Sequence, residues 1–173
     1  MTRKDELLSL VDRIPDAFTR AMTHFMLDNA PPHFWVKPSS AGKYHPPDEH
    51  GFEGLLLHSI RVAGVGWVIC ESSLGRLDSS TILSACAIHD ICRYGDKEQG
   101  EQYTVRQHPE LAAQLIRSLT GDALAAVADA VETHTGRWGK VTPRNETEWA
   151  VHYADNIAAN YLSWSSNGRG GKL

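Results

Sequence analysis

Apolar residues recur at helical spacing along most of this 173-residue chain. Leu55, Val62 and Ile69, for example, fall on one face of a long apolar stretch. Such stretches predict helices at residues 4–13, 15–28, 53–73, 79–92, 108–119, 121–135 and 146–164. Pro15 fits the first turn of the second helix. Because no stretch shows the alternation typical of a strand, the pattern predicts a single all-α domain of about six or seven helices.

Residues 29–51 form the longest connection between predicted helices. They contain five of the eight prolines and are too rich in Pro, Gly and Ser to predict a helix. Aromatic residues such as Trp35 and Tyr44 argue against a disordered linker, and loops of this length are usually functional. The domain therefore divides into N-terminal helices at 1–28, the loop at 29–51, a helical core at 52–165 and a tail at 166–173.

Several predicted helices carry an ionisable residue on the apolar stripe that should face the core. In the stretch around residues 82–90, Ile82 and Cys86 lead at helical spacing to His89, which Asp90 follows directly. The same arrangement occurs in four other predicted helices, with His58, His108, His134 and Asp155.

Each of these residues has a simpler explanation when it is taken alone. A single histidine on an apolar face is usually a hydrogen-bonded core residue, and His108 and His134 also lie near predicted helix ends, where they could cap. Burying a carboxylate, however, costs several kcal/mol, against a total stability of roughly 5–15 kcal/mol. Two carboxylates and four histidines in one core therefore point to a shared divalent cation. The mixed ligand set suits Mn, Fe, Co, Ni or Zn better than Mg alone, with Mg possible only as a second ion.

Composition narrows the class of protein. The net charge is −4, so the chain has no basic field that would attract long nucleic acid. The three cysteines form no CxxC pair, which predicts reduced thiols and a cytoplasmic protein. We see no apolar run of about 18 residues that would span a membrane, and the sequence MTRKDELLSL lacks a signal peptide's apolar core.

Five sequence blocks resemble the HD superfamily of metal-dependent phosphohydrolases, in the order found in that family. They extend over roughly residues 51–160 and read GLLLHSIRVA, AIHDICRYG, HPELAAQLI, ETHTGRWG and VHYADNIAAN. The resemblance implies a helical bundle of the HD type, with a histidine, a His-Asp doublet and a distant aspartate as metal ligands. These ligands are His58, His89, Asp90 and Asp155.

The resemblance leaves the number of metal ions open at one or two. Relatives with two ions add two histidines between the doublet and the last aspartate, and the aspartate of the doublet bridges the ions. His108 and His134 stand in those places, and Asp90 would be the bridge. In a hydrolase of this kind, Asp90, Arg93 and His134 are the candidate catalytic residues.

Candidate substrate-binding residues are the basic, polar and aromatic side chains in or near these blocks. Arg93 follows Asp90 by three residues and suits a phosphate clamp, although it could also be a surface residue. The loop at 29–51 and residues 134–140 would form the walls of the site. The further candidates for substrate binding are Trp35, Ser39, Lys43, Tyr44, His45, Arg61 and Trp138. Of these, the aromatics could stack on a base or belong to the core, and His45 could act as an acid or base or lie exposed in the loop.

The leading function is hydrolysis of a nucleotide, because small HD proteins of this length include deoxynucleoside triphosphate triphosphohydrolases, some cleaving dATP, and 5'-monophosphatases. One alternative is an HD phosphodiesterase or 3'-5' exoribonuclease that acts on short oligonucleotides. A second is a metal-stabilised nucleotide-binding module without catalysis, and an oxygenase of the family's diiron branch is a remote third. The expected partner is a small-molecule nucleotide, with no membrane. Aromatic residues near the C-terminus, Tyr161 and Trp164, also favour a homo-oligomer.

Overall fold

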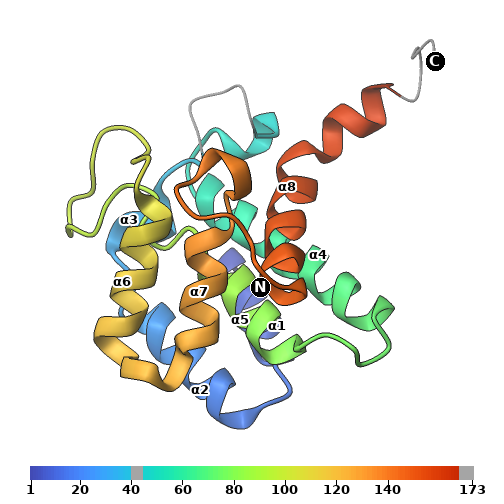
Figure 1. Ribbon diagram of the computed structural model, residues 1–173. Coiled ribbons are helices and arrows are strands. Elements are labelled where there is room, and N and C mark those ends of the chain that lie inside the picture. Colours follow the sequence, from blue (N-terminus) through green and yellow to red (C-terminus); the bar gives the residue numbers. More distant parts are fainter. Residues whose placement is uncertain (40–44, 168–173) are drawn as a thin grey trace.

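A computed structural model describes residues 1–39 and 45–167 of the chain. This part consists of helices and contains no strand, which confirms the predicted all-α class (Figure 1). The α-helices are α1 (Arg3–Val11), α2 (Ala17–Asp28), α3 (Pro32–Val36), α4 (Gly54–Ser72), α5 (Ser79–Ile88), α6 (His108–Thr120), α7 (Ala125–Thr133) and α8 (Glu146–Asn167). Three short 3-10 helices join them, η1 (Pro47–Glu49), η2 (Gly121–Leu124) and η3 (Gly136–Trp138).

Three predictions about where helices lie were wrong. Pro15 is not in the first turn of α2, because Asp16 caps that helix by accepting a hydrogen bond from Thr19 N at 2.6 Å. The predicted helix at 79–92 ends at Ile88, where the backbone continues in tighter i to i+3 turns. The loop at 29–51 contains α3, since the proline at its start needs no backbone donor there, and it also contains η1.

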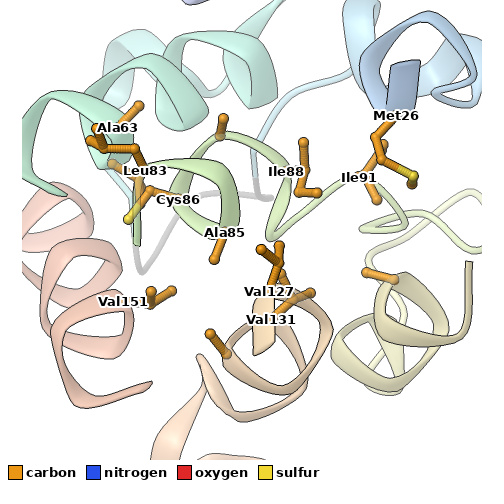
Figure 2. Close-up of a cluster of buried hydrophobic side chains, with 14 of the residues drawn as sticks. Met26, Ala63, Leu83, Ala85, Cys86, Ile88, Ile91, Val127, Val131 and Val151 are labelled. Atoms are coloured by element: carbon orange, nitrogen blue, oxygen red, sulfur yellow. The ribbon is translucent and has the colours of Figure 1, made fainter. Parts of the chain in front are cut away.

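Helix α5 forms the centre of the bundle. It packs against α1, α2, α4, α7 and α8, and every residue from Thr81 to Ile88 is buried. Figure 2 shows its side chains between Ala63 of α4 on one side and Val127 and Val131 of α7 on the other. The residues that follow α5 therefore emerge in the interior of the protein.

Helix α4 is long and apolar enough to cross a membrane by length and composition alone, with a mean hydropathy of 1.3. The sequence prediction that no such segment exists was therefore too strict. In the bundle, α4 packs against α1, α3, α5 and α8, and 56% of this segment is buried. Its apolar composition is accounted for by the core.

Backbone hydrogen bonds fix the residues after α3 to the start of α4 and to the end of η1. Leu55 N donates to Lys37 O at 2.9 Å, and Ser39 N donates to Glu49 O at 3.0 Å. Gly54 packs so closely that a Cβ atom there would lie 1.9 Å from the Glu49 carbonyl oxygen, so only glycine fits. This packing holds Glu49 beside the first turns of α4.

Candidate metal centre

The predicted metal ligands converge from five elements. His58 lies in the second turn of α4, and Asp155 lies in the middle of α8. The others lie at helix ends: His89 and Asp90 follow α5, His108 begins α6, and His134 follows α7. The histidines and Asp90 are buried, and the Asp155 side chain is 20% exposed. Sequence reasoning therefore identified a group of residues that the fold does bring together.

A first group of ligand atoms surrounds His89 Nε2. His58 Nε2 lies 3.0 Å from Asp155 Oδ1, and His89 Nε2 lies 3.5 Å from Asp90 Oδ2 and 3.9 Å from Asp155 Oδ1. His58, His89 and Asp155 form one of the groups in the described residues that could hold a metal ion. His89 Nε2 is buried without a hydrogen-bond partner.

A second group lies on the other side of the Asp90 carboxylate. Asp90 Oδ1 is 3.0 Å from His108 Nε2 and 3.6 Å from His134 Nε2, and the two Nε2 atoms are 3.2 Å apart. Asp90 therefore offers one oxygen to each group, as the bridging residue of a two-ion site would.

Three of the histidines are oriented by the same local contact. The Nδ1 atoms of His89, His108 and His134 lie 3.0, 2.7 and 2.6 Å from the carbonyl oxygens of Cys86, Val105 and Val131, each three residues earlier. A proton on Nδ1 satisfies this carbonyl and leaves the Nε2 lone pair facing the cluster.

These residues fit a divalent ion. Ligand atoms bound about 2.0–2.2 Å from one ion stand roughly 3.0–3.5 Å from one another, which matches most of the separations in both groups. The unpartnered His89 Nε2 supplies the buried lone pair that such an ion would satisfy. Burial disfavours the charged forms of Asp90 and Asp155. Arg93, His89 and His108 outweigh it at Asp90, and His58, His89 and His134 outweigh it at Asp155, so both pKa values lie below the usual range. Two ionised carboxylates and neutral imidazoles suit Mn, Fe, Co, Ni or Zn.

Glu49 is a residue of the site that the sequence analysis missed. Its side chain is fully buried, with Oε2 accepting a hydrogen bond from His45 Nδ1 at 2.9 Å and lying 3.2 Å from His58 Nδ1. Arg61 NH1 donates to Oε1 of the same carboxylate. Burial opposes ionisation of Glu49, but these partners outweigh it and hold the pKa of this carboxyl well below its usual range. Glu49 thus lies behind the ligand His58, on the side away from Asp155.

Two of the predicted substrate-binding residues, Arg93 and His45, lie beside the cluster. Arg93 NH1 donates to both oxygens of Asp90, at 3.0 and 3.2 Å. Arg93 NH2 lies 3.3 Å from His45 Nε2. His45 therefore connects Glu49 to the arginine that contacts Asp90.

A cavity of about 480 Å³ opens onto the cluster. The predicted residues His45, Arg93, His108, His134, Trp138 and Asp155 line it, together with Thr135, His152, Asn156 and Asn160, which the sequence analysis did not select. Thr135 Oγ1 is buried without a hydrogen-bond partner. His152 is held by a hydrogen bond from Nδ1 to His134 O at 2.7 Å, and its ring packs where a Cβ on Gly136 would lie 2.6 Å away. The cavity volume falls within the range of small-molecule sites.

Other predicted substrate residues lie elsewhere. Trp35 packs edge-to-face on Phe34 and lies under the ammonium of Lys4 in α1. Arg61 pairs with Asp48 and Glu49 and borders a separate, mainly apolar cavity of about 590 Å³ between α4 and α8. Ser39 is buried, and its Oγ donates to the backbone and side chain of Glu49.

The structure therefore assigns Trp35 to packing, and it assigns Arg61 and Ser39 to the support of Glu49, rather than to the cavity wall. Lys43 and Tyr44 lie outside the described residues, as do the side chains of Tyr161 and Trp164.

Comparison with known proteins gives one kind of match. A family model described as HD domain matches residues 55–160. No curated protein and no solved structure matches the chain. The matched range contains every residue of the two ligand groups and ends within α8, whereas Glu49 and His45 precede it.

Replacing Glu49 by glutamine should weaken metal binding. Glu49→Gln removes the negative charge next to His58 Nδ1, so we expect the affinity for Mn²⁺ to fall about 10- to 100-fold, measured by calorimetric titration. Asp48→Asn is the matched control, because Asp48 also pairs with Arg61 but its side chain is 52% exposed, whereas Glu49 is buried against His58. Equal affinities of Glu49→Gln and the wild type would contradict this role.

Metal binding should strengthen as the pH rises. Burial lowers the pKa of His58, but the hydrogen bond with Asp155 and the contact with Glu49 outweigh it and raise the pKa to about 9. A metal ion needs the neutral imidazole, so a proton must leave His58 below that pH. We expect the Mn²⁺ affinity to rise by up to about tenfold per pH unit between about pH 6 and 9, with proton release detected by calorimetry in buffers of different ionisation enthalpy.

The metal-free protein should show the opposite trend in stability. The folded-state pKa of His58 lies above its unfolded value of 6.5. The stabilisation from this proton is therefore complete below pH 6.5 and is lost as the pH rises through about 9.

For the metal-binding prediction, an affinity for Mn²⁺ that does not change with pH would contradict protonation of His58.

Proposed function

The chain belongs to the HD-domain family, and on this basis we propose that it is a metal-dependent phosphohydrolase that acts on nucleotides. HD domains are in general metal-dependent phosphohydrolases, and some members of the family are not catalytic. The observation that carries the proposal is the cluster of buried histidine and aspartate side chains at the wall of a cavity large enough for a nucleotide.

The primary ion would be held by His58, His89, Asp90 and Asp155. A bound divalent ion lowers the pKa of a coordinated water and stabilises charge on phosphoryl oxygens. Around it, Arg93 supplies a fixed positive charge that faces the phosphate. His134 and Thr135 offer hydrogen-bonding atoms at the same wall.

The remaining walls suit the nucleoside part of a substrate. Trp138 is 58% exposed and lines the cavity, so one face of its indole is available for a base. Asn156 and Asn160 of α8 line the same space and add amide groups to this wall, although the Asn160 amide also donates to Asn156 O at 2.8 Å. We propose a (deoxy)nucleoside triphosphate, dATP among them, or a 5'-monophosphate as substrate. The three described cysteines are free and buried, which is compatible with the cytoplasmic location that we propose.

Loss of a primary ligand should remove metal and activity together. We expect His89→Ala and Asp90→Ala to abolish both bound metal, measured by elemental analysis, and phosphate release from nucleoside mono-, di- and triphosphates. His24→Ala is the control, because His24 pairs with Asp12 on the surface of α2. A wild-type protein that binds metal but hydrolyses none of these compounds, and no short oligonucleotide, would support a binding module instead.

One specific observation favours the second candidate function, a phosphodiesterase for short oligonucleotides. Trp149 and Tyr153 are exposed on α8 and stack on each other with ring centroids 5.5 Å apart. Trp149 also contacts His152 of the cavity wall, which lies beside Trp138. This strip of aromatic rings, Trp138, His152, Trp149 and Tyr153, leads out of the cavity along α8 and could carry a second base.

Kinetics on two substrates separate these candidates. If a second base stacks on the strip, Trp149→Ala and Tyr153→Ala should each lower kcat/KM for a trinucleotide about 5- to 100-fold and leave the value for a mononucleotide unchanged. Tyr103→Ala is the matched control, because Tyr103 is also an exposed tyrosine but does not belong to this strip. Unchanged trinucleotide kinetics in both variants would leave the mononucleotide as the substrate.

A further inference from the structure

The Asp90 carboxylate has polar or charged neighbours on both of its sides. Oδ2 faces His89 and the first ligand group, and Oδ1 faces His108 and His134. An ion in the first group satisfies only one side. The other oxygen, which is buried in the interior, still needs a hydrogen-bond donor or a cation of its own.

Arg93 already places a positive charge across both oxygens of Asp90, Oδ1 on the second side included. Its NH1 atom lies 3.0 Å from Asp90 Oδ2, 3.2 Å from Asp90 Oδ1 and 3.4 Å from His108 Nε2. Its NH2 atom lies 3.3 Å from His45 Nε2. The Arg93 side chain is only 15% exposed. It contacts Asp90 after α5, His108 at the start of α6 and His45 before η1.

We infer that the guanidinium of Arg93 takes the place of a second metal ion, so that the protein binds one divalent ion per chain. The ion is held by His58, His89, Asp90 and Asp155. NH1 donates to the Oδ1 side of Asp90 and to His108 Nε2, the two atoms that a second ion would need first.

The chemistry of arginine makes this replacement permanent. A guanidinium does not lose its proton in a protein and has no lone pair to offer a metal. NH1 lies against both Asp90 Oδ1 and His108 Nε2, the atoms that would ligate a divalent ion there, and its positive charge would repel that ion. His108 and His134 then act as hydrogen-bonding groups at the cavity wall rather than as metal ligands.

The inference rests on the primary ion of the proposed function but not on catalysis, so it is tested by counting ions. The wild type, Arg93→Lys and Arg93→Gln are saturated with Mn²⁺, freed of weakly bound metal and analysed for manganese per chain, with electron paramagnetic resonance to detect coupled ions. We expect one ion in the wild type and in Arg93→Lys, which keeps the charge. We expect two coupled ions in Arg93→Gln, and one again in Arg93→Gln combined with His108→Ala.

Two ions in the wild type or in Arg93→Lys would overturn the inference, and so would a single ion in Arg93→Gln. If Arg93→Gln does not fold, the number of ions bound by the wild type and by Arg93→Lys still tests the inference, because two ions in either protein would contradict it. A wild-type protein without any tightly bound ion would overturn the proposed function as well. A protein with one ion and no hydrolase activity would overturn only the proposed function.

Discussion

The structure depends on the need to compensate one buried carboxylate. Asp90 follows the most enclosed helix of the bundle, so its charge emerges where water cannot reach it. Arg93 and three histidines gather around it, each brought by a different turn or helix end. A bundle of apolar helices could pack without these groups and would then be more stable in isolation. An ion held at this point would explain why the chain buries them.

The geometry of the centre depends on short-range contacts. Each of His89, His108 and His134 is aimed by a carbonyl oxygen three residues earlier in its own chain segment. His58 is aimed differently, between Asp155 and a glutamate from outside the region that the family match covers. Of the candidate ligands, His58 is therefore the one whose pKa depends on a residue, Glu49, that lies outside the range matched by the family model.

The sequence predicted the helices and the ligands for the same reason. An ionisable residue on an apolar stripe is visible because the stripe has a period, and this applied to His58, His89 and Asp155. Glu49 lies in a short 3-10 turn without any period, and its burial follows from backbone contacts with the start of α4. Trp35 illustrates the converse limit, since an aromatic residue in a loop can face a cavity or a neighbouring helix, and only packing against α1 decides.

The close contact of Gly54 with the Glu49 carbonyl has a mechanical consequence. This contact joins η1 to α4, the hydrogen bond from Leu55 N to Lys37 O joins the end of α3 to α4, and the one from Ser39 N to Glu49 O joins α3 to η1. His45 borders the cavity, and His58 is a candidate metal ligand; both contact Glu49 of η1. A movement of η1 that widens the cavity beside His45 would therefore also displace the Glu49 carboxylate from His58, and entry of a small molecule on this side would be coupled to the position of a candidate metal ligand.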